Sequence, residues 1–423
     1  MRNPVRNQLP DPIPALQSFV GIVNTKRSKA FGYGGLQVAL NVEVDDDKRL
    51  VRRDGYELGM EGAYDGLYGS QNQRKLLAIR DASLISFQPD MSEVVLAGGM
   101  LPGQYSWDED PNNNIYFTST AGSSGIVMDD GTFRPLMLVS PTILSASAVN
   151  TAGWQVLPFK LGARYTTNVV HLFATFVLAD ERETAPSESI TISVSPNVSL
   201  ISIHTTAPPA GGTVNVYATA PGGSTYYLVS SNTQDSITFP TLYLNRRATG
   251  ADYPYTTGVV NFPDNADMLA CYNGSMYASM YDEVAKVGVI YKSMPLQYHL
   301  FQPSASGFIS VSGQPLLMLP CKAGLVIGTD TNIYLWNDEK LETLTEYGVV
   351  PGVCGDVLPN GTAFFWTLRG VAKAMPYELV TEPLFSGDPG VFNHARIFHD
   401  RGYRKLVAST VAGNKSFNQW RSR

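Results

Sequence analysis

The stretch KAGLVIGTDTNIYLWND spans residues 322–338 and holds two short apolar segments separated by a polar turn. Apolar side chains alternate at Leu325 and Ile327, and again at Ile333 and Leu335. Successive side chains of a β-strand point to opposite faces, so this spacing places the apolar residues of each segment on one face. The stretch therefore predicts a β-hairpin.

Hairpins of the same kind recur along the chain without a strict motif. Four further stretches with this pattern are RKLLAIRDASLISFQ (74–88), NNIYFTSTAGSSGIVMDDG (113–131), DMLACYNGSMYASMY (267–281) and NGTAFFWTLRGVAKAMP (360–376). Hairpins at intervals of roughly 40–50 residues are typical of β-propeller blades, because each small sheet buries a face against its neighbour. A sandwich or a series of barrels would give similar strings. We expect an all-β fold with a β-propeller body.

Residues 160–250 lack the recurring hairpin pattern and are rich in Thr, Ser and Val. Apolar alternation at Val214 and Val216 continues at Tyr226 and Leu228, beyond the turn Pro221-Gly222-Gly223. A module of about 90 residues with this pattern has the size of a β-sandwich. We expect this sandwich to be inserted into the propeller.

The inserted segment resembles the fibronectin type III-like modules of phage and bacterial surface proteins. Glu188-Ser189 stands where these modules carry an "ES" pair before a crossover. Val216-Tyr217 and Tyr227-Leu228 stand at their characteristic pair of strands, and Ala218 replaces the Arg or Lys that is common there. The resemblance implies a fibronectin type III-like fold for the insertion.

Composition divides the chain into five segments. Residues 1–30 contain four prolines and no sustained periodicity, which predicts an extended N-terminal arm. The other expected segments are the first part of the propeller (31–159), the sandwich (160–250), the second part of the propeller (251–410) and a basic C-terminal tail (411–423). Charged residues make up only 16% of the chain, so we expect much of the surface to be neutral polar or covered by partners.

The net charge of −6 is unevenly distributed. Residues 1–30 sum to +4 and residues 391–423 to +6, which leaves −16 for the middle of the chain. Basic ends on an acidic body favour docking between subunits or onto an acidic neighbour. An acidic body argues against tight wrapping of DNA, whereas an acidic channel would repel phosphates and let a duplex slide.

The sequence lacks motifs that carry chemistry. The acidic groups 45–47, 108–110 and 129–130 are consecutive residues at expected solvated turns, whereas a Ca²⁺ loop places its ligands at alternating positions. The chain contains no HExxH, GxSxG or GxxxxGK[ST] motif. His394 and His399 are five residues apart and cannot share one face of a strand. We predict no catalytic residue, no cofactor and no metal ligand.

The three cysteines, Cys271, Cys321 and Cys354, are odd in number and far apart. This spacing suggests neither a disulfide framework nor a metal site. We expect buried free thiols.

The segment FGYGGLQVALNVEVDDDKRLVRRDGYE covers residues 31–57. Asn41 follows a short apolar stretch, and the polar residues Asp45 to Lys48 follow Val42 and Val44. A polar turn there predicts a hairpin with Leu50 opposite Val44, and Arg52-Arg53 then precedes a turn that contains Gly55. This order resembles the opening of the tail-nozzle, or packaged-DNA stabilization, propellers of short-tailed phages, where it also follows an extended arm. Asp54 stands where that family often has Pro.

The resemblance implies a structural virion protein of a phage tail, synthesised in the host cytoplasm. Several copies, six or twelve, would form a ring that extends or closes the DNA channel, contacts other tail or connector proteins and passes genomic DNA without sequence-specific binding. No apolar run approaches the roughly 18 residues that span a bilayer, so we expect no membrane insertion. The expected subunit contacts are the basic residues of the two termini: Arg2, Arg6, Lys26, Arg27, Lys29, Arg401, Arg404, Lys405, Arg421 and Arg423.

Two other functions stay open at this point. A module that binds a host-surface glycan or protein would use aromatic residues on wide loops, namely Tyr105, Trp107, Tyr253 and Tyr255, unless these are buried in strands. A propeller that hydrolyses polysaccharide would need two carboxylates facing each other across a cleft, and sequence spacing does not reveal such a pair.

Overall fold

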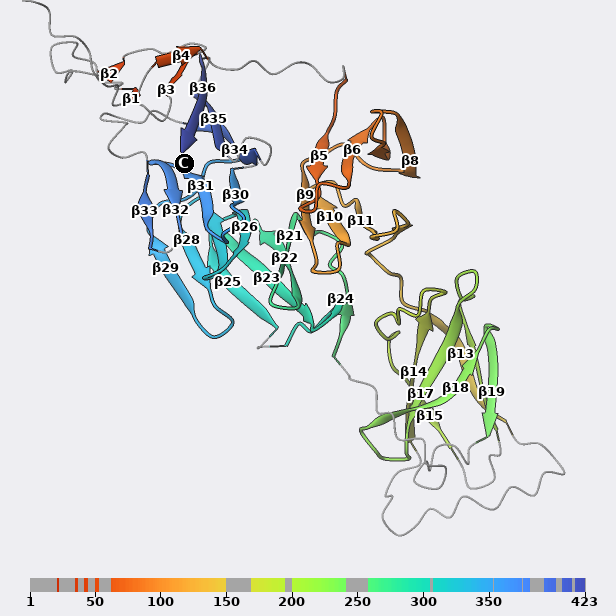
Figure 1. Cartoon of the computed structure of the whole chain (residues 1–423). Helices are drawn as coiled ribbons and strands as arrows, with labels where there is room; N and C mark the ends of the chain where they lie inside the picture. Colours follow the sequence, from red (N-terminus) through yellow and green to blue (C-terminus); the bar gives the residue numbers. More distant parts are fainter. Residues whose placement is uncertain are drawn as a thin grey trace, which may run out of the picture. The chain divides into compact units, whose positions relative to one another are not determined.

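The computed structural model describes residues 62–149, 169–194, 200–240, 258–304, 307–352, 354–374 and 376–380, and the backbone alone of seven strands nearer the termini. These residues form strands, turns and irregular segments, which confirms the all-β prediction (Figure 1). Among them there is no helix capable of spanning a membrane. The chain divides into two compact units, Ala63–Ser312 and a unit made of Met1–Gly62 with Gly313–Arg423.

Two four-stranded antiparallel sheets begin the unit Ala63–Ser312. In each sheet the strands follow chain order, which makes it an up-and-down meander, the blade unit of a β-propeller. The first sheet consists of β5 (Gly66–Gly69), β6 (Leu76–Arg80), β7 (Ser83–Phe87) and β8 (Glu93–Gly98). The second consists of β9 (Tyr105–Glu109), β10 (Ile115–Ser119), β11 (Ser124–Val127) and β12 (Phe133–Arg134).

These two blades share one apolar core. Leu77 and Ile79 of β6 pack with Ile115 and Phe117 of β10, and all four side chains are fully buried. Gly125 of β11 lies opposite Phe117, and the space above it is filled by aromatic rings. Burial of such side chains is the main stabilising contribution in a small sheet, since each is worth about 1.5–3 kcal/mol.

The next segment forms a sandwich of two sheets. Strands β13 (Ile143–Val149), β16 (Leu200–Thr205) and β19 (Ser236–Pro240) form one sheet in the order β13-β16-β19. The other has the order β15-β14-β17-β18 and contains β14 (Val169–Val177), β15 (Ile190–Ser193), β17 (Thr213–Thr219) and β18 (Tyr226–Asn232). Their inner faces enclose a core that includes Leu172, Ile203, Val216 and Phe239. β13 thus belongs to the sandwich, while the expected boundary at residue 160 lies outside the described residues.

A larger sheet completes this unit. It has the order β20-β24-β23-β22-β21, and β25 also pairs with β23. Its strands are β20 (Val260–Asn261), β21 (Met268–Tyr272), β22 (Ser275–Asp282), β23 (Val287–Met294), β24 (Gln297–Phe301) and β25 (Phe308–Ser312).

The other unit contains two further blade-type meanders. One is formed by β26 (Pro315–Cys321), β27 (Gly324–Thr329), β28 (Ile333–Trp336) and β29 (Leu341–Thr345), and the other by β30 (Gly355–Val357), β31 (Ala363–Thr367), β32 (Gly370–Lys373) and β33 (Glu378–Leu379). The strands described by their backbone alone are β1 (Gly21–Ile22), β2 (Gly35–Leu36), β3 (Val42–Val44), β4 (Leu50–Arg52), β34 (Phe392–Asp400), β35 (Lys405–Ala412) and β36 (Lys415–Ser422).

The predicted hairpins are confirmed by the strand pairing. β6–β7, β10–β11, β21–β22, β27–β28 and β31–β32 are adjacent antiparallel pairs, and Val44 lies opposite Leu50. In β27 the side chains of both faces are buried, so the strand lies inside its unit and does not have one solvated face. Val326, Ile333 and Leu335 of this blade pack with Phe365 and Trp366 of the next meander.

Four hairpin turns share one construction. They span Gln88–Ser92, Met128–Thr132, Leu178–Arg182 and Leu358–Thr362. In each, the third residue is Asp or Asn and its side-chain oxygen accepts a hydrogen bond from the backbone N–H of the fifth, while the fourth has a positive φ. Asp and Asn favour such turns because they bond to the backbone two residues on. The expected turn at 129–130 is one of these four.

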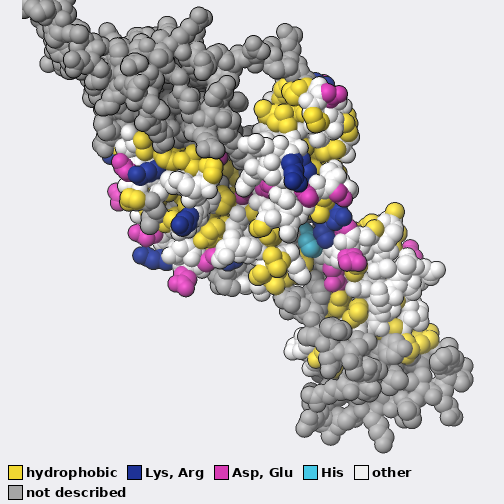
Figure 2. All heavy atoms as spheres, viewed as in Figure 1, with side chains coloured by type: hydrophobic (Ala, Val, Ile, Leu, Met, Phe, Trp, Pro, Cys, Tyr) yellow, Lys and Arg dark blue, Asp and Glu magenta, His cyan; other side chains and the backbone are white. Residues whose placement is uncertain are grey.

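Hydrophobic side chains are exposed on the first blade (Figure 2). Leu67 on β5 and Val95 on β8 are 62% and 63% exposed, and they lie at the two ends of one cross-strand row that passes through Ala78 and Ile85. Edge strands that expose apolar residues offer unpaired backbone groups to another chain.

Candidate functional site

The expectation of a solvated turn at 108–110 is wrong. Tyr105–Glu109 forms strand β9, and Glu109 and Asp110 are only 8% and 6% exposed. Two backbone N–H groups donate to the Asp108 carboxylate, from Cys271 to Oδ2 (2.6 Å) and from Glu109 to Oδ1 (2.8 Å). The acidic group is therefore part of a contact between two sheets.

We call this contact between β9, β10 and the edge of β21 the seam. Ser106 Oγ accepts a hydrogen bond from Leu269 N (3.2 Å) and donates one to Leu269 O (3.3 Å). Thr118 Oγ1 donates to Ala266 O (2.8 Å), just before β21. β21 is the last strand of its sheet among the strands that the structure describes, and these side chains bind the backbone groups of its outer edge.

Burial controls the protonation of groups at the seam. Removal from water raises the pKa of Asp108 to about 7, and the charge of Glu109 adds to this effect. Burial also raises the pKa of the Cys271 thiol well above its ordinary value, so the thiol is neutral. Tyr116 donates to Asp110 Oδ2 (3.2 Å), and burial raises its pKa. The seam is thus a set of polar groups that are neutral or held by backbone N–H groups.

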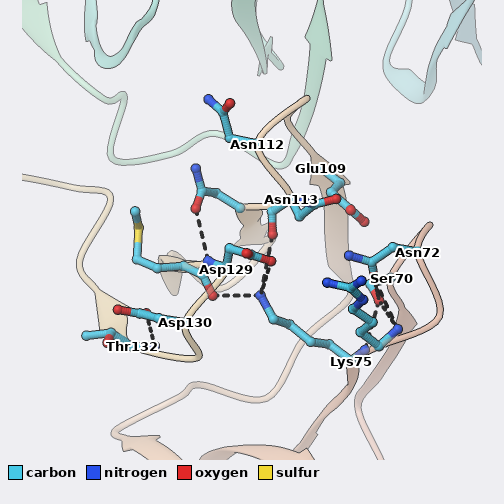
Figure 3. A network of polar contacts seen from close by, with 12 residues as sticks. Ser70, Asn72, Lys75, Glu109, Asn112, Asn113, Asp129, Asp130 and Thr132 are labelled. Atoms are coloured by element: carbon cyan, nitrogen blue, oxygen red, sulfur yellow. Dashed lines mark hydrogen bonds and ion pairs between the residues drawn. The ribbon is translucent and has the colours of Figure 1, made fainter.

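Three turns next to the seam are tied together by Lys75 (Figure 3). Its Nζ donates to Met128 O (2.7 Å) and Asn113 O (3.4 Å) and lies 3.6 Å from Asp129 Oδ1. The Lys75 side chain is only 13% exposed. A single cation therefore fixes turns of both blades relative to each other.

A second polar contact attaches the sandwich to the large sheet. Asn261 Oδ1 accepts from Ala185 N (2.8 Å), and Asn261 Nδ2 donates to Ser140 Oγ (2.9 Å). His299 Nε2 contacts Glu183 O (3.0 Å), and the Glu183 carboxylate accepts hydrogen bonds from Tyr217 OH (2.7 Å) and other groups of the sandwich. Burial lowers the pKa of His299 to about 4, so the ring is neutral and donates to the carbonyl. We call this contact the sandwich junction.

These two contacts hold elements in place, and their polar atoms are engaged with backbone groups and with each other. Among the residues that the structure describes, no three His, Cys, Asp or Glu side chains gather as a metal would require. The three cysteines are free thiols, with Cys354 buried and the other two half-buried.

The aromatic pair expected on a wide loop is mostly buried. Tyr105 is 6% exposed, and Trp107 stacks on Tyr68 with ring centroids 5.7 Å apart. Neither is free to stack on a sugar. Tyr253 and Tyr255 lie outside the described residues.

The predicted subunit contacts fall almost entirely outside the described part of the chain. Lys405 lies on β35 and Arg421 on β36, where only the backbone is described. The other eight predicted contacts lie outside the described residues: Arg2, Arg6, Lys26, Arg27, Lys29, Arg401, Arg404 and Arg423. The acidic group 45–47 also lies outside.

Sequence reasoning missed the seam, although one signal was present. Residues 105–109 have the sequence YSWDE, in which polar Ser106 and Asp108 alternate with aromatic side chains. That alternation is typical of a strand with one polar face and contradicts a turn.

No protein-family model and no curated protein matches the chain. Among solved structures, the Dos1 propeller aligns with 90% of this chain and 81% of its own, at 10% identity and a TM-score of 0.35. Saccharomyces cerevisiae Sqt1 aligns with 84% of this chain and 83% of its own, at 9% identity and a TM-score of 0.31. Porphyromonas gingivalis dipeptidyl peptidase 4 aligns with 86% of this chain, which covers 46% of that protein, at 10% identity and a TM-score of 0.31. At these TM-scores the similarity assigns no family or activity, and the propeller-type body follows from the strand pairing of its meanders.

Proposed function

We propose that the chain is a structural subunit of a phage tail, in which several copies form a ring that extends or closes the DNA channel. The observation that carries the proposal is segment 31–57, whose order of residues is similar to the opening of the tail-nozzle propellers. Its strands β3 and β4 form the hairpin that this order requires, with Val44 opposite Leu50. The blade-type meanders that follow agree with the same family.

The use of the polar groups supports a mechanical role. At the seam, Ser106 and Asp108 bind the backbone of another sheet, and Lys75 ties three turns together. Such contacts resist the separation of blades. The acidic middle of the chain, with a sum of −16 over residues 31–390, suits a surface along which a duplex slides, because like charges repel. The ring would contact other tail or connector proteins and act without a cofactor or covalent chemistry.

Electron microscopy tests the proposal directly. Negative-stain images of the purified protein with its tail components should show a ring of six or twelve copies. Deletion of residues 1–28 should abolish assembly and leave the thermal melt of the body nearly unchanged. Assembly that survives the deletion would refute the role of the arm, and a chain that stays monomeric with those components yet binds a sugar would refute the tail function.

A further inference from the structure

An arginine side chain in the unit that contains Gly313–Arg423 lies over an aromatic ring. Arg369 lies in the exposed turn between β31 and β32, and its guanidinium carbon is 4.4 Å from the centroid of the Tyr347 ring. With the residues that the structure describes, the guanidinium makes no hydrogen bond or ion pair besides this ring contact. Within this part of the chain its N–H donors have no acceptor, and they can bind an external group.

The turn positions Arg369 without help from the guanidinium. Thr367 is fully buried, and its Oγ1 accepts from Arg369 N (3.0 Å) and donates to Gly370 O (2.8 Å). The turn between β27 and β28 has the same construction, since Thr329 Oγ1 accepts from Thr331 N (3.2 Å). There Thr331 occupies the place of Arg369. The fold thus builds this turn with an uncharged residue, and the arginine is not needed for it.

The ring beneath the guanidinium is also held in place. Tyr347 OH and Tyr377 OH share a hydrogen bond of 2.6 Å, and Thr345 Oγ1 donates to Tyr347 O (2.7 Å). Leu368, next to Arg369, is 39% exposed. Arg and Tyr are enriched at interface hot spots. The planar fork of a guanidinium matches the geometry of a carboxylate.

The surrounding charge selects the kind of partner. Residues 313–380 hold four Lys or Arg against seven Asp or Glu. Duplex phosphate binding depends on several cations acting together, so this acidic neighbourhood disfavours DNA. A second copy of the chain offers single exposed carboxylates that have no hydrogen bond or ion pair of their own within the described residues; they include Glu181, Glu188, Asp264, Glu283, Glu342 and Glu346.

We infer that the Arg369 platform, formed by Arg369, Leu368 and Tyr347, binds an exposed carboxylate of a second copy of this chain. The inference rests on the proposed ring and names one of its contacts. One surface meets a different surface of the next copy, and a rotational arrangement of such contacts closes into a ring.

Self-association of the full chain, measured by sedimentation velocity over a range of protein and NaCl concentrations, tests the inference. Arg369→Ala should weaken self-association at least tenfold. The association of Arg369→Lys should be intermediate between that of Arg369→Ala and that of wild type, because a lysine lacks the planar fork. Tyr347→Phe should behave like wild type, whereas Tyr347→Leu should behave like Arg369→Ala. Arg74→Ala, which removes an exposed arginine of the first blade, is the matched control. Thermal melts verify that each variant is folded.

The result that overturns the inference is association that is equally strong in Arg369→Ala and wild type, or a wild-type chain that is monomeric throughout. The experiments distinguish failure of the Arg369 contact from failure of the tail function. Tail rings that form equally well with Arg369→Ala would keep the tail function and remove this contact. Association that depends on Arg369 in a protein absent from tail particles would keep the contact and remove the tail function.

Discussion

Asp108→Asn is the substitution that tests the seam most sharply. The folded protein holds the pKa of Asp108 at about 7, mainly through burial, against an ordinary value of 3.8. The folded state therefore binds a proton more tightly than the unfolded state. Stability from the neutral acid is complete below pH 3.8 and is lost as the pH rises through about 7.

The size of the change in stability follows from the difference between the folded and unfolded pKa values of Asp108. Between about pH 4.5 and pH 8 the wild type should lose about 3 kcal/mol at this site, at 1.36 kcal/mol per pKa unit. Asn cannot ionise, so the variant does not lose this stability as the pH rises. Asn has one acceptor oxygen for the N–H groups of Cys271 and Glu109, which costs about 1–3 kcal/mol at every pH. The variant should be less stable than wild type by roughly 1–3 kcal/mol near pH 4.5 and should gain about 3 kcal/mol relative to wild type by pH 8, where it is as stable as wild type or up to roughly 2 kcal/mol more stable.

Urea unfolding at a series of pH values, followed by tryptophan fluorescence, measures how the difference in stability between variant and wild type changes with pH. Trp107 on the same strand, β9, is one of the five tryptophans that contribute to the signal. Asp90→Asn is the matched control, because Asp90 lies in an exposed turn and hydrogen bonds to Ser92 lower its pKa. That variant should keep a constant offset from wild type over the same range. If Asp108→Asn also keeps a constant offset, the carboxyl group does not titrate at the seam and the reasoning is refuted.

Three further substitutions test other contacts. Between about pH 7.5 and pH 5 the wild type should lose about 2 kcal/mol of its free energy of unfolding at His299, and His299→Gln should remove this loss. Urea unfolding measures it, and a variant with the same pH dependence as wild type would contradict the prediction. Lys75→Met keeps the aliphatic stem but loses the charged bond to Met128 O, and should destabilise the first two blades by about 1–3 kcal/mol in thermal melts, whereas a neutral effect would show that the turns hold without it. Gly125→Ala places a Cβ 2.4 Å from Phe133 and should cost about 1–3 kcal/mol, and a wild-type melt would mean that the rings move aside.

Local patterns predicted the elements that depend on neighbours in sequence. The hairpin of β27 and β28 followed from alternation around a polar turn, and the pairing of Val44 with Leu50 followed from the polar residues between them. The strands β17 and β18 pair around Gly222, whose φ of 68° is the left-handed conformation that a Gly adopts without strain. In each case the paired residues are close in the chain, so the pattern contains the information.

The seam and the sandwich junction depend on residues far apart. Ser106 and Leu269 are separated by 163 positions, and Glu183 and His299 by 116. No local pattern pairs such residues. The acidic group 108–110 was assigned to a turn because consecutive acids are usually solvated. Burial reversed that assignment, since the free backbone edge of β21 supplies the N–H group that accommodates Asp108.

The two contacts respond to acid in opposite directions. Asp108 has a raised pKa, so lowering the pH from about 7.5 to 5 should strengthen the seam by roughly 2–3 kcal/mol. His299 has a lowered pKa, so the same change should weaken the sandwich junction by roughly 2 kcal/mol, because a buried imidazolium would lie beside Arg182. The stability of the whole unit should therefore change little, while its weakest point moves from the blades to the attachment of the sandwich. Hydrogen exchange at Cys271 and at Ala185, whose N–H groups lie in the two contacts, should show protection rising at the first and falling at the second as the pH is lowered, after correction for intrinsic rates.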